Sequence, residues 1–216
     1  FLPLHIFEPR YRLLVEDLLA RPDEAEREFG IVAIRDGYDV DRDGMAALHP
    51  IGTATVLRQA ERLPDGRFDI VTTGSRRFRI VDVDASRPLL IGAVEFLEDV
   101  SDPADVLLAS QVGARFRDYR AALSGQVAGG AADVGDGSQP LDDDEDGLPD
   151  DPTVLSYLVT AAMLLQVDER QRLLAAPTTG ERLALARALL ARETGLISTL
   201  SAVPALDLPG APPSAN

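Results

Sequence analysis

The chain has 216 residues, of which 45% are hydrophobic and 26% charged, a composition typical of a folded globular protein. It has no cysteine, and all 21 basic residues are arginine, so thiol chemistry and the P-loop, Schiff-base and Ser–Lys mechanisms are excluded. The net charge of −15 disfavours nucleic acid as a partner, because nucleic-acid affinity comes mainly from neutralising phosphates.

The first hundred residues carry one helical pattern and then several strand patterns. Apolar residues at helical spacing over 8–20, with Pro9 in the first turn, predict an amphipathic helix. Its apolar stripe is Tyr11, Leu14, Val15, Leu18 and Leu19. Short β-branched runs bounded by turn residues then predict five strands, at 29–34, 51–57, 68–73, 78–83 and 89–97. With a hairpin turn at 63–66, this order predicts a small barrel-like sheet over residues 1–100.

The second hundred residues return to helical spacing. Apolar stripes at 108–123, 153–166, 168–175 and 179–194 predict a helical bundle over residues 101–200. Residues 124–151 interrupt it without periodicity and hold nine acids and no base, which predicts a disordered acidic insertion. Residues 201–216 are rich in proline and alanine and predict a flexible tail. The chain is therefore expected to be of the α+β class.

Two acidic motifs match the first half of a calcium-binding loop. An Asp-x-Asp-x-Asp-Gly pattern begins at Asp39 and again at Asp142. The twelfth positions, Pro50 and Thr153, cannot supply the bidentate carboxylate that closes such a loop. We therefore expect a polar turn and an acidic insertion rather than metal sites, and no cofactor.

The remaining candidate side chains are expected to have structural roles. His5 lies in an apolar run and is expected to pack and donate one hydrogen bond, because no Gly-x-Ser-x-Gly elbow accompanies it or His49. The densest basic cluster spans 76–79, where strand alternation places Arg77 and Arg79 on one face and Arg76 on the other. These arginines are expected to pair with surface acids rather than to bind nucleic acid.

Several blocks resemble the N-terminal, substrate-binding domain of Lon proteases. The opening FLPLHIFEPRYR at 1–12 is similar to the family's P-L-x-I-F-E-P-R-Y block. FGIV at 29–32, IGTA at 51–54 and GSRRFRI at 74–80 follow in the family's order. The helical half matches more loosely. The residues that carry the resemblance are expected to be structural rather than to contact a substrate: His5, Phe7, Glu8, Pro9, Arg10, Tyr11, Gly52, Thr53, Arg77 and Phe78. Among them, Glu8 is expected to favour the positive helix end and Arg10 to pair with an acid across the sheet.

The resemblance implies a PUA-like β pseudo-barrel with an embedded helix, followed by an α-helical bundle. It also implies a non-catalytic module that holds unfolded or tagged polypeptides, as an adaptor or holdase for an ATP-dependent protease. The chain contains no ATPase or peptidase module, so we expect a free-standing member of the family. No membrane-spanning stretch or signal peptide is visible, so a cytoplasmic location is expected. A hydrolase-type enzyme and a small-ligand sensor stay open as alternatives, and so does the oligomeric state.

Overall fold

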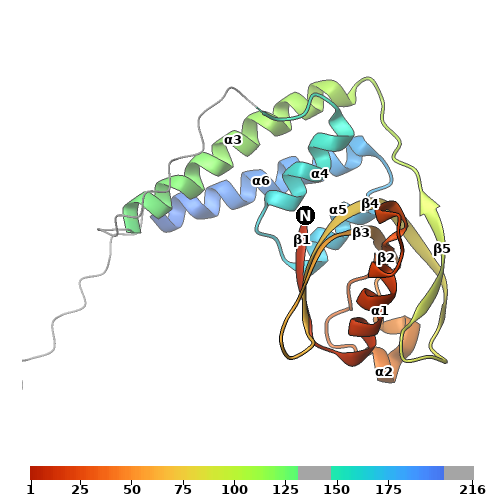
Figure 1. The fold of residues 1–216 in the computed structure, drawn as a ribbon. Coiled ribbons are helices and arrows are strands. Elements are labelled where there is room, and N and C mark those ends of the chain that lie inside the picture. The colour runs from red at the N-terminus through yellow and green to blue at the C-terminus, as the bar shows by residue number, and fades with distance from the viewer. Residues whose placement is uncertain (131–146, 202–216) are drawn as a thin grey trace, which may run out of the picture. The chain divides into compact units, whose positions relative to one another are not determined.

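The structure is a computed structural model that describes residues 1–130 and 147–201 (Figure 1). These residues form two compact units. The sheet unit contains Phe1–Asp99 together with Leu165–Ala175, and the helical unit contains the remaining described residues. No helix within the described ranges is both long and apolar enough to cross a membrane.

Five strands form one antiparallel sheet in the sheet unit. The strands are β1 (Leu2–Ile6), β2 (Glu28–Ile31), β3 (Ile51–Arg62), β4 (Phe68–Asp84) and β5 (Ile91–Leu97). β3 pairs with one edge of β4 and with β2 on its other side. β1 and β5 pair one after the other with the second edge of β4. Within the part of the chain that the structure describes, β1, β2 and β5 are therefore the edge strands.

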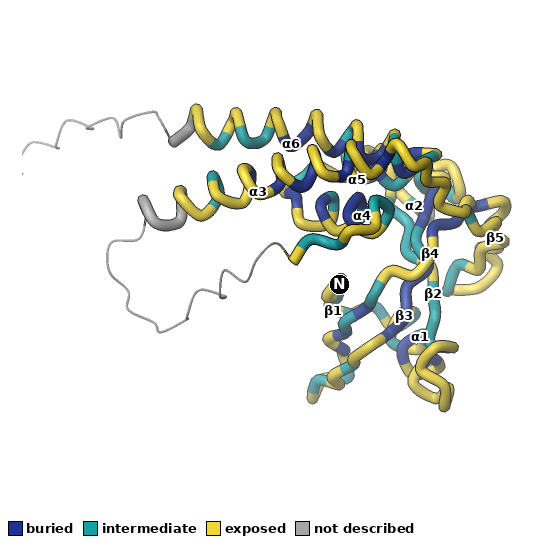
Figure 2. Tube along the Cα trace, turned by 90° about the horizontal axis from the view of Figure 1, so that it is seen from above, coloured by how far each residue is buried: buried dark blue, intermediate teal, exposed yellow. Residues whose placement is uncertain are grey.

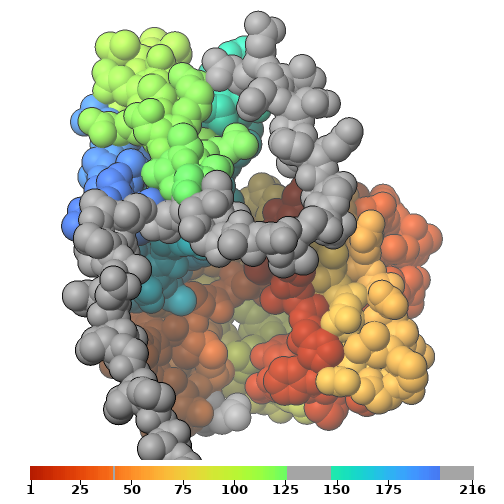
Figure 3. All heavy atoms as spheres, turned by 90° about the vertical axis from the view of Figure 1, so that its left-hand side faces the viewer, coloured from red at the N-terminus to blue at the C-terminus, as the bar shows by residue number. Residues whose placement is uncertain are grey.

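The hairpin that joins β3 to β4 is the turn that the sequence predicts. Gly66 has a φ of 81°, a left-handed conformation that favours glycine, and its N–H donates to the Leu63 carbonyl at 2.9 Å. β1 lies beside this hairpin, in red next to orange and yellow in Figure 3.

The two strands predicted at 68–73 and 78–83 are one continuous strand, β4. The ladder between β3 and β4 shifts register where Thr55 faces Gly74 but Ala54 faces Arg76, which leaves Ser75 as an extra residue. A bulge of this kind bends a strand without ending it. The prediction of a break at this point was wrong because Gly74 and Ser75 also have the composition of a turn.

Helix α1 (Pro9–Leu19) packs against one face of the sheet. Val15 and Leu18 are buried in one cluster with Leu57, Phe68 and Ile70. Leu14 is half-buried against the same cluster, whereas Tyr11 and Leu19 are exposed. The apolar stripe is therefore buried along its middle only.

A second cluster lies on the opposite face of β3. Ala54 and Leu57 are an odd number of residues apart in the same strand, so their side chains point to opposite faces. Leu57 belongs to the α1 cluster, whereas Ala54 packs with Phe78 and Ile80. β3 is consequently buried on both faces over residues 51–57, and Figure 2 draws much of this strand in the colour of buried residues.

Helix α5 (Val167–Ala175) belongs to the sheet unit, not to the helical half to which the sequence assigned it. Gln171 donates from Nε2 to the carbonyl of Ile51 at 2.8 Å, and Arg77 donates to the carbonyl of Leu174 at 2.8 Å. The assignment was wrong because a short amphipathic helix carries no signal for the surface that will bury its apolar side.

The helical unit contains α3 (Asp105–Gly130), α4 (Pro152–Ala162) and α6 (Thr179–Ser201). α3 continues through 124–130, where the sequence predicted the insertion to begin. α6 continues to Ser201, past residue 194, where the predicted helical stripe ends. Arg182 is fully buried, donates to Ser156 Oγ at 3.0 Å and lies 4.1 Å from the centroid of the Tyr157 ring. Most of the predicted insertion (131–146) and the tail from 202 onward lie outside the described residues.

Candidate functional site

The ten residues that carry the family resemblance, called the signature residues below, separate into two groups by burial. Gly52, Arg77 and Phe78 are buried in the sheet, and Thr53 beside them is half-buried. The other six lie on β1 and at the start of α1, where His5, Phe7, Pro9 and Tyr11 are exposed and Glu8 and Arg10 are half-buried.

The buried group is organised around the Phe78 ring. A Cβ at Gly52 would come within 2.5 Å of this ring and 2.8 Å of the Ile31 carbonyl oxygen, and a Cβ at Gly30 would come within 3.1 Å of the ring. β2 and β3 therefore both carry a glycine where the Phe78 ring packs. This contact explains why the FGI, IGT and RFRI blocks occur together.

We expect Gly52→Ala to lower the free energy of unfolding by about 1–3 kcal/mol, the usual cost of overpacking. The matched control is Gly92→Ala in β5, where a Cβ would meet the Val94 side chain at an ordinary 3.6 Å. Urea unfolding followed by the amide NMR signals of β3 and β4 measures both. Equal stabilities of the two variants would contradict this account of the signature.

Each arginine of the cluster at 76–79 makes an ion pair, as the sequence predicts. Arg76 pairs with Glu28 at 3.1 Å, and Arg79 pairs with Glu95 at 2.9 Å. Arg77 pairs with Asp99 at 2.8 Å while its side chain is only 4% exposed. The three pairs therefore differ mainly in burial, because α5 covers Arg77 and leaves the other two in solvent.

The exposed group does not pack as the sequence predicts for His5. The Nδ1 of His5 lies 2.6 Å from Asp69 Oδ1, and Arg67 Nη1 lies 3.0 Å from its Nε2. A guanidinium can only donate, so Nε2 must accept and Nδ1 must carry the proton donated to Asp69. The predicted hydrogen bond is present, but the His5 side chain is solvent-exposed rather than packed.

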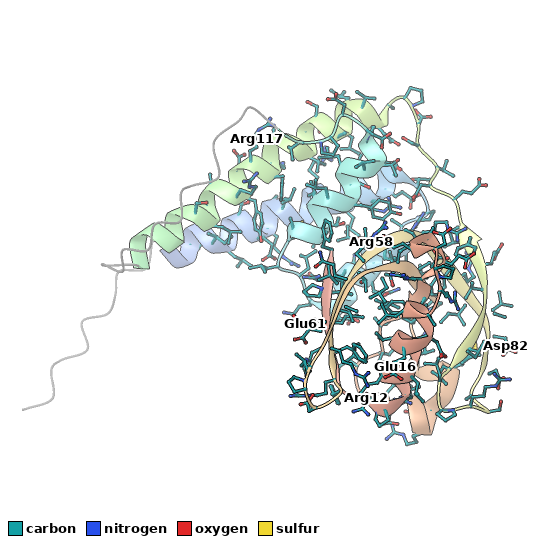
Figure 4. The ribbon with its side chains drawn as sticks, in the orientation of Figure 1. Arg12, Glu16, Arg58, Glu61, Asp82 and Arg117 are labelled. Carbon is teal, nitrogen blue, oxygen red and sulfur yellow. The ribbon has the colours of Figure 1, made fainter. Side chains whose placement is uncertain are left out.

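An open hollow of about 600 Å³ lies along the outer side of β1, β4 and β3. His5, Asp69 and Glu61 form one row across its floor, because His5 and Glu61 both face Asp69 in the sheet register. Both nitrogens of His5 are engaged, Nδ1 by Asp69 and Nε2 by Arg67, so His5 is not a free general base. Glu61 is labelled in Figure 4.

Arg10 has an acid partner close by in the sequence. Its Nε donates to Glu8 Oε2 at 2.8 Å, two residues away. Glu8 itself is the N-cap residue of α1, and its carbonyl accepts from the N–H groups of Tyr11 and Arg12. The Glu8–Arg10 pair therefore closes the first turn of the helix locally.

The first calcium-like motif is a helix cap. Asp39 is the N-cap residue of α2 (Val40–Asp43) and accepts from the N–H of Arg42 at 3.0 Å. Hydrogen bonds from the Arg42 side chain and the Asp39 N–H lower the pKa of Asp43. Across residues 1–130 and 147–201, no three His, Asp or Glu side chains are placed to hold a metal ion. The acids of the second motif, from Asp142, lie outside the described residues.

Several large apolar side chains of the sheet unit face solvent, and sequence patterning did not identify them. Phe7 is 61% exposed and Leu13 is 62% exposed, near the junction of β1 and α1. Ile91, Val94 and Phe96 of β5 are also exposed. The run at 89–97 is apolar at nearly every position, which normally indicates a buried strand, so its exposure could not be found from the pattern.

An antiparallel sheet with an embedded helix, followed in the chain by a helical unit, is an α+β fold. The model of the ATP-dependent protease La (LON) substrate-binding domain matches residues 1–192. The chain belongs to this family, and it is therefore a member of a substrate-binding domain family.

The chain is similar in sequence to much longer proteins. It is 22% identical over 208 residues to Lon protease 1 of Herpetosiphon aurantiacus, which covers 91% of this chain and 23% of that protein. It is 31% identical over 72 residues to the Lon protease of Porphyromonas gingivalis, which covers 33% of this chain and 8% of that protein. The chain thus spans less than a quarter of the length of these relatives.

Two solved structures share the fold. A Lon N-terminal domain protein from Xanthomonas campestris aligns with a TM-score of 0.54 and 21% identity over 88% of each chain. The N-terminal domain of Mycobacterium avium complex Lon protease aligns with a TM-score of 0.55 and 16% identity over 90% of each chain. The predicted α+β class with a PUA-like pseudo-barrel is thereby confirmed.

Proposed function

We propose that this chain is a non-catalytic module that binds unfolded or tagged polypeptide segments in the cytoplasm and delivers or holds them for an ATP-dependent protease. Membership of the substrate-binding domain family supports this proposal. The observation that carries it furthest is the exposure of large apolar side chains such as Phe7, Leu13 and Phe96 on a folded sheet unit. An unfolded client exposes apolar side chains that can pack against such a surface, whereas a folded protein buries most of its own.

The first test compares one protein in two states. Reduced, carbamidomethylated lysozyme and native lysozyme are fluorescently labelled and titrated with the full chain, and binding is followed by anisotropy. We expect the unfolded form to bind with a dissociation constant on the order of micromolar and native lysozyme to bind far more weakly, since a transient interface of this kind is small. Equal affinity for the two states would contradict the proposal.

Charge must be separated from unfolding in this test. Lysozyme is basic and the chain carries −15, so part of any affinity is electrostatic and weakens as salt screens it. The titrations are therefore repeated at low and high salt. The preference for the unfolded state should persist at high salt, because apolar contacts are not screened.

Adaptor and holdase roles predict different second measurements. A holdase lowers the light scattering of a heat-unfolded client without any other protein present. An adaptor instead raises the rate at which a purified Lon protease degrades that client with ATP. An increase in degradation rate without suppression of scattering assigns the adaptor role, and the reverse assigns the holdase role.

A further inference from the structure

β5 is the most exposed strand of the sheet unit. Six of its seven residues are exposed and only Leu97 is half-buried, although the strand IGAVEFL contains a single charge, Glu95. It pairs with β4 along one edge, and within residues 1–130 and 147–201 no strand pairs with its other edge. A row of unpaired N–H and C=O groups on an apolar strand is a template for another extended chain.

The other two edge strands are less suited to pairing with an added chain than β5 is. β1 contains Pro3, which has no backbone N–H to donate, and β2 is only four residues long. β5 is seven residues long and contains no proline. Strand addition is therefore most favourable at β5.

The register identifies the backbone groups that point to the free edge. The N–H of Ile80 donates to the Pro50 carbonyl at 2.9 Å, so Ile80 directs its backbone groups toward the β3 side of β4. Ile80 faces Val94, and this pair is therefore a non-hydrogen-bonded pair of the β4–β5 ladder. Val94, and by alternation Phe96, direct their N–H and C=O groups away from β4.

The two faces beside this edge differ in chemistry. Val94 and Phe96 face Ile80 and Phe78, so they extend the buried Phe78 cluster outward to solvent. On the other face, the β5 residues Ile91, Ala93 and Glu95 alternate with Val94 and Phe96. The acids Asp82, Asp84 and Glu95 lie on this face with Arg79, whereas Arg77 farther along the same face is buried. Asp82 projects outward beside β5 in Figure 4. One face is thus apolar, with the Arg76 guanidinium 3.8 Å from the centroid of the Phe96 ring, and the other is acidic.

We infer that β5 binds an extended polypeptide segment as an added strand, with apolar residues alternating with basic residues. The added chain places its apolar side chains beside Val94 and Phe96 and its basic side chains beside Asp82 and Glu95. A second copy of this chain fits less well, because pairing β5 with β5 brings like charges together on a chain that already carries −15. This inference rests on the proposed function and names its surface and the pattern of its client.

The variant Val94→Pro tests the edge with little effect on the sheet. Its missing N–H points to the free edge, so proline removes a donor that β4 does not use. We expect Val94→Pro to weaken binding of unfolded lysozyme about tenfold or more, since the ring also blocks an approaching strand. Val94→Ala, which keeps the N–H, should weaken binding only about two- to threefold. If both variants bind equally well, strand addition at β5 is wrong.

A measurement on the unaltered chain makes the test independent of variant folding. Three acetylated peptides of seven residues, the length of β5, are compared. Valine alternates with arginine in the first, with serine in the second and with glutamate in the third. NMR amide exchange should show new protection at Val94 and Phe96 when peptide binds, with affinity falling from the arginine to the serine to the glutamate peptide. Unchanged exchange at both amides, or the opposite order of affinities, overturns the inference.

The arms of the experiment separate the two proposals. If unfolded lysozyme does not bind the unaltered chain, the proposed function fails. The amide exchange of Val94 and Phe96 with peptide then still tests whether β5 accepts an added strand. If lysozyme binds the chain and Val94→Pro equally, only the inference fails. Protection of Val94 and Phe96 that rises with protein concentration in the absence of peptide assigns the edge to a second copy and overturns the inference.

Discussion

Arg77→Met should lower the free energy of unfolding of the sheet unit by about 3–5 kcal/mol, the usual cost of breaking a buried ion pair from one side. Arg77 is 4% exposed and donates to Asp99 at 2.8 Å and to the carbonyls of Leu174 and Glu98. Methionine retains most of the volume but none of these donors. The last turn of α5 then loses its hydrogen bond from β4.

The matched control is Arg79→Met, two residues along the same strand. Arg79 also makes an ion pair, with Glu95 at 2.9 Å, but both side chains are more than half exposed. An exposed pair contributes about 0–1 kcal/mol, so this variant should be close to the unaltered chain in stability. The amide NMR signals of β3 and β4 in urea report the sheet unit alone, which avoids assuming that both units unfold together.

A second readout distinguishes loss of the α5 contact from general loosening. In Arg77→Met, the amides of α5 should exchange faster than those of β3, because the helix detaches before the sheet opens. Equal losses of stability in Arg77→Met and Arg79→Met would show that α5 does not depend on this arginine.

Leu18→Ala should lower the free energy of unfolding by about 2–5 kcal/mol, which combines the lost transfer free energy and the cavity left behind. Leu18 is 1% exposed among Val15, Leu57, Phe68 and Ile70. The next residue supplies the control, since Leu19 has the same side chain but is 39% exposed. Leu19→Ala should change stability by no more than about 0.5 kcal/mol, as surface positions usually do.

Leu14 gives the intermediate case in this series. It is half-buried against the same cluster, so Leu14→Ala should cost less than Leu18→Ala and more than Leu19→Ala. Binding of unfolded lysozyme should be unchanged in Leu14→Ala and Leu18→Ala wherever they remain folded. Weaker binding by Leu14→Ala with unchanged stability would instead make the α1 stripe a binding surface.

Local patterns predicted the elements of this fold well where the signal itself is local. The spacing of Leu14, Val15 and Leu18 identified α1, and the alternation at 76–80 correctly separated Arg77 from Phe78. The turn at Gly66 was identified because only a few residue types adopt its conformation. These features depend on residues close together in the chain.

The features that were missed depend on residues far apart. Arg77 is buried because α5 covers it, and the residue that accepts its bond, Leu174, follows 97 positions later. The bulge at Ser75 has no composition of its own beyond that of a turn. β5 has the composition of a buried strand, and only the strand order shows that it lies at an edge. The candidate surface was therefore not predictable from the sequence.

The path of the chain through the sheet unit has a consequence for its synthesis. The chain leaves this unit at Asp99 and returns only at Leu165, and β3 receives its bond from Gln171 across 120 positions. On a ribosome, the five strands emerge well before the helix that completes their cover. Until α5 arrives, Arg77 and the Ile51 carbonyl are open to solvent or to other nascent chains. The segment Val100–Leu164 of the helical unit is therefore synthesised after the sheet and before the helix that covers it. Contacts of such long range in the sequence are characteristic of slow folding.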